Sequence, residues 1–303
     1  MPEPMSAFAT AMFDQLKQPE SNVSFTERVD QLAVQCPCRH FIEVRPEEQQ
    51  LMRTCLEGRL KPPRVLDIGC GLGRHLVSSR QLSPNCQGTA VEINPQMLDH
   101  TVSAVRGTHP FRQFGDVPDK QRFDVVFLMG GGLGVFGDEA NTREQLRRIF
   151  QQLSADGDVL IESGNPFNNK LFYAANLTIE YTTIADEAVT MADEAVWGFA
   201  KREWVERTLR DIGFTVVSFT QSSVGGPFFI CHAKRQSKPT MKPAASKSAT
   251  NGKPDKWNPK PGPSAPPKTF FFSATTSATK VNPPKKRRVT VASKPIKPAK
   301  VRK

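Results

Sequence analysis

Short apolar runs alternate with amphipathic stretches between Arg64 and Arg235, a pattern typical of a parallel sheet built from βαβ units. A turn-like segment, S-S-V-G-G-P at 222–227, separates the last two apolar runs and predicts an antiparallel hairpin at the end of the sheet. The predicted strands are Arg64–Ile68, Gly88–Ile93, Phe123–Met129, Asp158–Glu162, Thr215–Thr220 and Phe228–His232, with a shorter one near Phe111–Phe114. We therefore expect an α/β fold with a doubly wound, mostly parallel sheet that ends in an antiparallel hairpin.

Two helices have clear boundaries in this pattern. One begins at about residue 141 and carries apolar side chains at helical spacing up to Leu153, after which Ala-Asp-Gly ends it. The other has an apolar face between Trp204 and Ile212 and ends at Gly213.

The segments outside this alternation have different characters. Residues 1–60 have amphipathic helical character, and we expect them to form a helical cap on the domain of residues 61–235. Residues 167–198 form an insertion with a near repeat, A-D-E-A-V at 185–189 and 192–196. We interpret this insertion as a lid or substrate wall, with a surface hairpin of no further role as the alternative.

The charge is divided unevenly along the chain. Residues 234–303 hold 19 Lys/Arg against the single acid Asp255, so this part carries +18, and the rest of the chain carries −7. From residue 236 onward the composition is rich in Lys and Pro, with no sustained apolar period. Such a segment buries too little apolar surface to offset its ordering entropy, so we expect residues 236–303 to be a disordered basic tail.

A glycine-rich loop follows the first predicted strand, in the segment V-L-D-I-G-C-G-L-G from Val65 to Gly73. Its spacing does not match G-x-G-x-x-G, because Arg74 and Leu76 occupy the third glycine position in the two registers. A phosphate loop needs Gly-Lys-Ser/Thr, which is also missing from this segment. What remains is an acid two residues before three alternate glycines.

This loop resembles motif I of the class I S-adenosylmethionine-dependent methyltransferases, and the resemblance extends over about residues 60–235, as in the small single-domain members. It implies a Rossmann-like fold with S-adenosylmethionine as cofactor. That ligand carries an ammonium and a sulfonium instead of phosphates, so an anionic loop suits it, and glycines allow the backbone to approach closely. The implied cofactor-binding residues of the loop are Asp67, Gly69, Cys70, Gly71 and Gly73, with the Cys70 side chain interpreted as packing.

Three further segments match the family in the expected order. Glu92 ends the second predicted strand 19 residues beyond Gly73, and the resemblance implies that it holds the ribose hydroxyls while Ile93 packs against adenine. Phe114-Gly115-Asp116-Val117 resembles the signature whose acid meets the adenine amino group, so Asp116 and Val117 are assigned to the cofactor. The segment that includes Met129 resembles the floor under the methionine part.

The sequence favours a small-molecule acceptor methylated on N or O. After the fourth predicted strand the chain lacks the Asp/Asn-Pro-Pro-aromatic motif of amino-group DNA methyltransferases and the Pro-Cys nucleophile of cytosine C5 enzymes. Two alternatives stay open. One is an RNA or protein methyltransferase, and the other is a non-catalytic methyltransferase-like scaffold that binds nucleic acid through its basic tail.

No catalytic residue is assigned from the sequence. His75, His109, Asp138 and Glu162 are candidates for a general base, but for each we favour a structural role. We also expect no metal, because the tight Cys-x-Cys-x-His spacing from Cys36 does not match the usual zinc patterns.

Location and partners follow from the same features. The chain has no secretion-like segment and no run of about 18 apolar residues, so we expect a cytoplasmic protein that does not span a membrane. A nuclear location is possible in a eukaryotic host, because Pro283–Val289 resembles a monopartite import signal. The tail, residues 236–303, is a possible binding segment for nucleic acid or an acidic partner.

Overall fold

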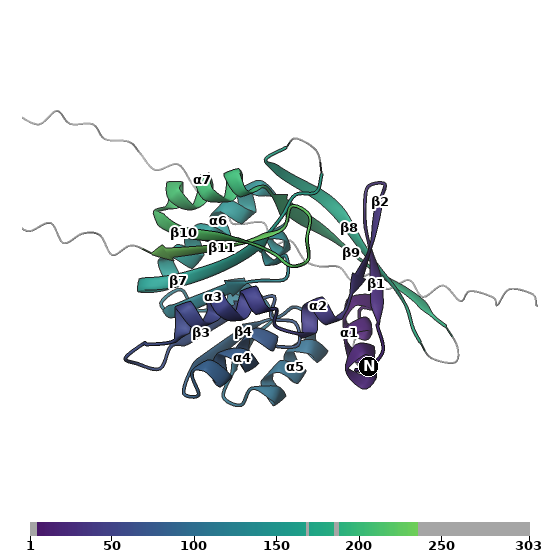
Figure 1. Ribbon diagram of the computed structural model, residues 1–303, viewed down its shortest axis with the longest axis horizontal. Coiled ribbons are helices and arrows are strands. Elements are labelled where there is room, and N and C mark those ends of the chain that lie inside the picture. The colour runs from purple at the N-terminus through teal and green to yellow at the C-terminus, as the bar shows by residue number, and fades with distance from the viewer. Residues whose placement is uncertain (1–4, 168–169, 185–187, 236–303) are drawn as a thin grey trace, which may run out of the picture.

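The computed structural model describes residues 5–167, 170–184 and 188–235, and its centre is a seven-stranded sheet (Figure 1). The strand order is β10-β11-β7-β6-β3-β4-β5. Five neighbouring strands are parallel, while β11 runs antiparallel to both β7 and β10. The strands of this sheet are β3 (Arg64–Ile68), β4 (Gln87–Val91), β5 (His109–Phe111), β6 (Phe123–Leu128), β7 (Leu153–Ser163), β10 (Phe214–Gln221) and β11 (Phe229–Arg235).

The predicted fold class is therefore confirmed, including the antiparallel hairpin at the end of the sheet. The boundaries of some elements differ from the prediction. β7 begins directly after the preceding helix and is longer than the predicted Asp158–Glu162, and β5 ends at Phe111. Residues Phe114–Asp116, the end of one predicted strand, form the short 3-10 helix η1 instead.

Helices cover both faces of this sheet because its central strands are apolar on both sides. In β3, Val65 belongs to one apolar cluster and Leu66 to another, as expected for side chains that alternate between two buried faces. The first face packs against α3 (Pro46–Leu56), α4 (Arg74–Leu82) and α5 (Pro95–Ala104). The second face packs against α6 (Glu139–Gln152) and α7 (Arg202–Ile212).

The helical cap predicted for residues 1–60 is wrong for residues 24–37. Besides α1 (Ala7–Lys17), α2 (Arg39–Ile42) and α3, this segment contains the antiparallel strands β1 (Ser24–Val29) and β2 (Leu32–Pro37). The sequence signal for this hairpin is incomplete. Glu27 stands between the buried Phe25 and Val29 at an alternating position, and Leu32 is 44% exposed, so apolar alternation does not track burial well.

The insertion after β7 forms a hairpin of β8 (Phe172–Thr182) and β9 (Thr190–Ala200). This hairpin joins the N-terminal one, because β1 pairs with β8, in a second sheet of order β2-β1-β8-β9. Figure 1 shows the second sheet and α1 beside the main sheet. One copy of the near repeat, 185–189, lies largely outside the described residues, and the other lies in β9.

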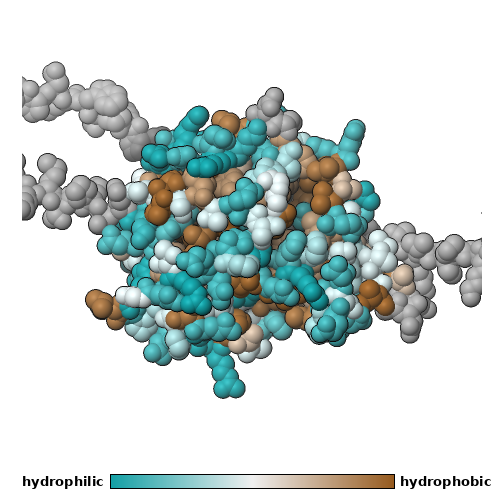
Figure 2. All heavy atoms as spheres, viewed as in Figure 1, coloured by the Kyte–Doolittle hydropathy of each residue, from teal (hydrophilic) through white to brown (hydrophobic). Residues whose placement is uncertain are grey.

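Hydrophilic side chains dominate the face drawn in Figure 2, where apolar residues appear mainly as separate small patches. Within the described residues, no helix has both the length and the apolar composition needed to cross a bilayer. The basic tail that the sequence predicts to be disordered, residues 236–303, lies outside the described residues.

Candidate active site

The loop between β3 and α4 has the backbone shape that its glycines predict. Gly69, Gly71 and Gly73 have φ values of +73°, +56° and +80°, in the left-handed region where residues with a Cβ are strained. Gly73 has a second requirement, because a Cβ there would lie 2.6 Å from Thr101 Cγ2. Gly69 is exposed, and a Cβ there would meet only Val135, at 3.6 Å. The loop is therefore closed toward α5 at Gly73 and open at Gly69.

Glu92 fastens this loop to the end of the neighbouring strand. Its Oε2 accepts a hydrogen bond from the Gly71 amide at 2.9 Å, and its Oε1 accepts one from the Asn94 amide, also at 2.9 Å. Burial raises the pKa of Glu92. Each carboxylate oxygen keeps a second lone pair, so Glu92 can accept further hydrogen bonds from a pair of hydroxyls. The structure thus brings together two residues that the sequence assigned to the same ligand.

Asp67 is the most unusual charged group at this edge of the sheet. Its side chain is 1% exposed, and neither carboxylate oxygen has a hydrogen-bond partner among the described residues. A buried carboxylate without donors is costly, and a cation placed beside it removes the cost. Asp67 therefore fits a ligand that brings a positive charge, and S-adenosylmethionine is such a ligand.

The remaining residues assigned to the cofactor divide into exposed and buried ones. Ile93 is 36% exposed beside Glu92, and Asp116 is exposed in η1 at the end of the next strand. The side chains of Cys70, Val117 and Met129 are packed in the apolar core at 4%, 1% and 5% exposure. These three residues therefore leave little surface open to a ligand. Burial also raises the pKa of the Cys70 thiol.

A buried ion network that sequence reasoning missed lies behind the glycine loop. Glu48 of α3 is fully buried and is held by Arg45 at 2.5 Å and by both terminal nitrogens of Arg74, at 2.8 and 3.0 Å. Arg45 also donates to Glu162 of β7 at 2.7 Å, and Glu162 accepts from the Gly130 amide, also at 2.7 Å. The network thus connects three elements with the loop that follows β6.

His75, one of the proposed base candidates, belongs to the same network. Its Nδ1 lies 3.6 Å from Asp67 Oδ2, and its Nε2 lies 3.6 Å from Glu48 Oε1. Burial and the Arg74 guanidinium act to lower the pKa of His75, but the Asp67 and Glu48 carboxylates outweigh them and raise it above its ordinary value. A histidine held between two acids with a raised pKa does not suit a general base.

The other three base candidates have local structural partners or lie elsewhere. Asp138 caps α6 by accepting from the Asn141 amide at 2.8 Å. Glu162 is occupied by Arg45, Gly130 and Ser222. His109 is exposed at the start of β5, the edge strand two places from β3, which precedes the glycine loop.

Strand β9 of the second sheet packs against the segment that follows β6. The short 3-10 helix η2 (Gly132–Phe136) follows β6, and a Cβ added to Gly134 would lie 1.9 Å from Trp197 Nε1. The indole of Trp197 therefore rests directly on this glycine. Phe41 of α2 lies against Gly130, where a Cβ would be 3.6 Å from its ring. Two aromatic side chains thus contact the loop after β6.

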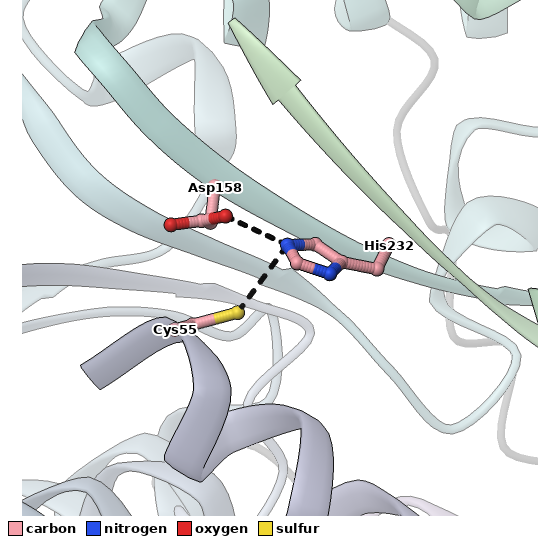
Figure 3. A group of neighbouring side chains, drawn as sticks. All are labelled: Cys55, Asp158 and His232. Atoms are coloured by element: carbon pink, nitrogen blue, oxygen red, sulfur yellow. Dashed lines mark hydrogen bonds and ion pairs between the residues drawn. The ribbon is translucent and has the colours of Figure 1, made fainter. Parts of the chain in front are cut away.

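A separate buried cluster has the residue types of a metal site. Cys55, Asp158 and His232 place one ligand atom each within 4.8 Å of one another, and Figure 3 shows both partners approaching the same His232 nitrogen. The distances from that Nε2 are 2.7 Å to Asp158 Oδ1 and 3.7 Å to Cys55 Sγ. Asp158 is already paired with Arg59 at 2.6 Å and Lys234 at 3.5 Å, so two cations compete with any metal. We assign this cluster a structural role.

Comparisons with known proteins agree with this geometry. Residues 65–157 match the family described as "Methyltransferase domain". No curated protein sequence matches the chain.

Solved structures of methyltransferases are similar to this chain in fold. A SAM-dependent methyltransferase from Bacteroides fragilis in complex with S-adenosyl-L-homocysteine is 18% identical, with a TM-score of 0.57, over 78% of this chain and 97% of that one. The sugar N-methyltransferase KedS8 from Streptoalloteichus sp. is 18% identical over 63% of this chain and 88% of that one, with a TM-score of 0.45.

The matched residues contain the glycine loop, Glu92 and the strands that hold them. The strand order, and the absence of a hydrogen bond to Asp67 among the described residues, agree with the cofactor that the sequence implied. Residues 65–157 of this chain are therefore a methyltransferase domain, and the fold is similar to that of an S-adenosylmethionine-dependent methyltransferase.

Proposed function

We propose that this methyltransferase transfers the methyl group to an N or O atom of a small-molecule acceptor. The observation that carries the proposal is the packing of Phe41 and Trp197 against the glycines of the loop after β6. Because side chains of α2 and β9 cover this loop, a compact acceptor suits the site better than a folded macromolecule. The hairpin of β8 and β9 then serves as the substrate wall.

The cofactor supplies an electrophilic methyl group on a sulfonium. The chain contributes position: Glu92 receives the ribose hydroxyls, Asp67 lies beside the ammonium group, and the exposed Ile93 and Asp116 face the adenine. Phe41 and Trp197 orient the acceptor and exclude water. Orientation and exclusion of water lower the barrier to methyl transfer without a covalent intermediate.

The acceptor class is tested by incubating the full chain with labelled S-adenosylmethionine and separated metabolite, protein and RNA fractions. We expect label in the metabolite fraction. Label confined to protein or RNA would overturn the small-molecule proposal and support one of the alternatives.

The role of the substrate wall is tested with Trp197→Ala. The variant should raise the KM for the acceptor and leave the affinity for S-adenosylhomocysteine unchanged. Val196→Ala is the matched control, because Val196 is the adjacent β9 residue and is 50% exposed. An unchanged acceptor KM in Trp197→Ala would contradict the proposal.

The cofactor contacts are tested by calorimetry with S-adenosylhomocysteine. Asp67→Ala and Glu92→Ala should each weaken binding, and unchanged binding in both would refute the assigned roles.

The basic tail is the observation that favours a macromolecular partner, because residues 234–303 carry +18. Truncation after Arg235 should leave cofactor affinity intact and remove salt-sensitive binding to nucleic acid. Loss of cofactor affinity on truncation would show instead that the tail is required by the domain.

A further inference from the structure

His75 lies between two carboxylates that differ in how well they are neutralised. It is the second residue of α4, its side chain is 5% exposed, and its ring packs at 5.7 Å from the ring of Phe127 in β6. Asp67 faces its Nδ1 from β3, and Glu48 faces its Nε2 from α3. Arg74 precedes it on α4.

The negative charge of Glu48 is neutralised by neighbouring arginines without His75. Arg45 and Arg74 both donate to it, and Arg45 also satisfies Glu162, the further acid in this network. Asp67 is different. Among the described residues, only His75 brings a cationic nitrogen within 4.0 Å of its carboxylate. Glu92, at the end of β4, offers Asp67 no positive charge, and the negative charge of Asp67 contributes to raising the pKa of Glu92 after the larger effect of burial.

We propose that protonated His75 is the counter-charge of Asp67 in the free protein, and that cofactor binding releases this proton to solvent. The inference rests on the proposed placement of the cofactor's ammonium group beside Asp67. Two cations then compete for one carboxylate in a buried site, and the histidine is the one that can become neutral. His75 is a positioning residue in this account, because it acts through Asp67.

The proposal makes cofactor affinity depend on pH in a defined direction. Because binding releases a proton, affinity rises with pH while free His75 is protonated and bound His75 is not, by up to about tenfold per pH unit. Above the pKa of His75 in the free protein, the affinity becomes constant.

The test is calorimetry of S-adenosylhomocysteine binding to the full chain between pH 5.5 and about 7, where an amino group on the ligand stays protonated. Two buffers with different ionisation enthalpies report the number of protons released. We expect wild type to release a fraction approaching one proton, and His75→Gln to release none and to bind with little dependence on pH. His232→Gln is the matched control, because the acid beside His232 is paired with Arg59, and it should release protons as wild type does.

The following results distinguish a failure of the proton-release proposal from a failure of the proposed cofactor placement. Normal binding by wild type without proton release overturns the proposal, and so does proton release that persists in His75→Gln. If Asp67→Asn binds as wild type does, the cofactor placement itself is wrong. If His75→Gln does not fold, the buffer dependence of wild type still decides, because it requires no variant.

Discussion

The buried ion network predicts that Glu48→Gln destabilises the protein strongly although it removes no volume. Glu48 is fully buried, and the side chains of Arg45 and Arg74 are 8% and 5% exposed. The substitution leaves two buried guanidiniums facing a neutral amide. Removing one partner of a buried ion pair costs about 3–5 kcal/mol, and because glutamine keeps one acceptor we expect the lower end, about 3 kcal/mol.

The assay is thermal and urea unfolding at neutral pH. A loss of 1 kcal/mol lowers the Tm of a domain of this size by about 2–4 °C, so Glu48→Gln should lower it by about 6–12 °C. Glu57→Gln is the control, because Glu57 directly follows the same helix and makes a half-exposed pair with Arg53 at 2.9 Å. Such a surface pair contributes about 0–1 kcal/mol.

The dependence on pH provides a second check. Burial acts to raise the pKa of Glu48, but His75, Arg74 and Arg45 outweigh it and lower the pKa well below 4.5. The stabilisation by Glu48 is therefore fully present above the pKa that this residue has in the unfolded chain. It is lost as pH falls toward the lower pKa of Glu48 in the folded protein. The difference between wild type and Glu48→Gln should shrink in acid. A loss below about 1 kcal/mol at neutral pH, comparable with the surface control, would refute the reasoning.

Three further predictions follow from single contacts. Gly73→Ala should lower the free energy of unfolding by about 1–2 kcal/mol because of the left-handed backbone at this position alone. Because the added Cβ would lie 2.6 Å from Thr101, we expect a further loss of stability, measured by unfolding, and weaker S-adenosylhomocysteine binding, measured by calorimetry. Gly134→Ala should displace Trp197, raising the acceptor KM with an unchanged cofactor Kd; an unaltered KM would count against the aromatic wall. Finally, the raised pKa of His75 means that its stabilising effect is fully present below about pH 6.5 and is lost as pH rises through the pKa of the folded state. In ligand-free protein, the stability advantage of wild type over His75→Gln should therefore decrease as pH rises above about 6.5.

Local patterns in the sequence are enough to predict the fold class and the glycine loop. Both depend on local patterns: apolar runs separated by amphipathic helices specify a parallel sheet, and glycines at alternate positions specify a left-handed backbone between Asp67 and Gly73. The placement of Glu92 at the end of the next strand also follows from order along the chain, because parallel neighbours end at the same edge. These features can be predicted without information on contacts between distant segments of the chain.

The side chains around that loop come from segments that are distant in the sequence, so they could be identified only in the folded structure. The hairpin of β1 and β2 was missed because most of β2 is exposed, and because the buried Val29 of β1 packs against residues of β8 and β9 that lie about 150 positions away or more. The ion network has the same origin: Arg45 meets Glu162 across 117 positions, and no local period links them. Sequence reasoning proposed His75 as a possible base, yet the two acids that surround it come from β3 and α3. The pKa of a buried side chain depends on the charges that folding places beside it in a medium of low dielectric. The protonation of such a residue therefore follows from tertiary packing and cannot be predicted from a sequence motif.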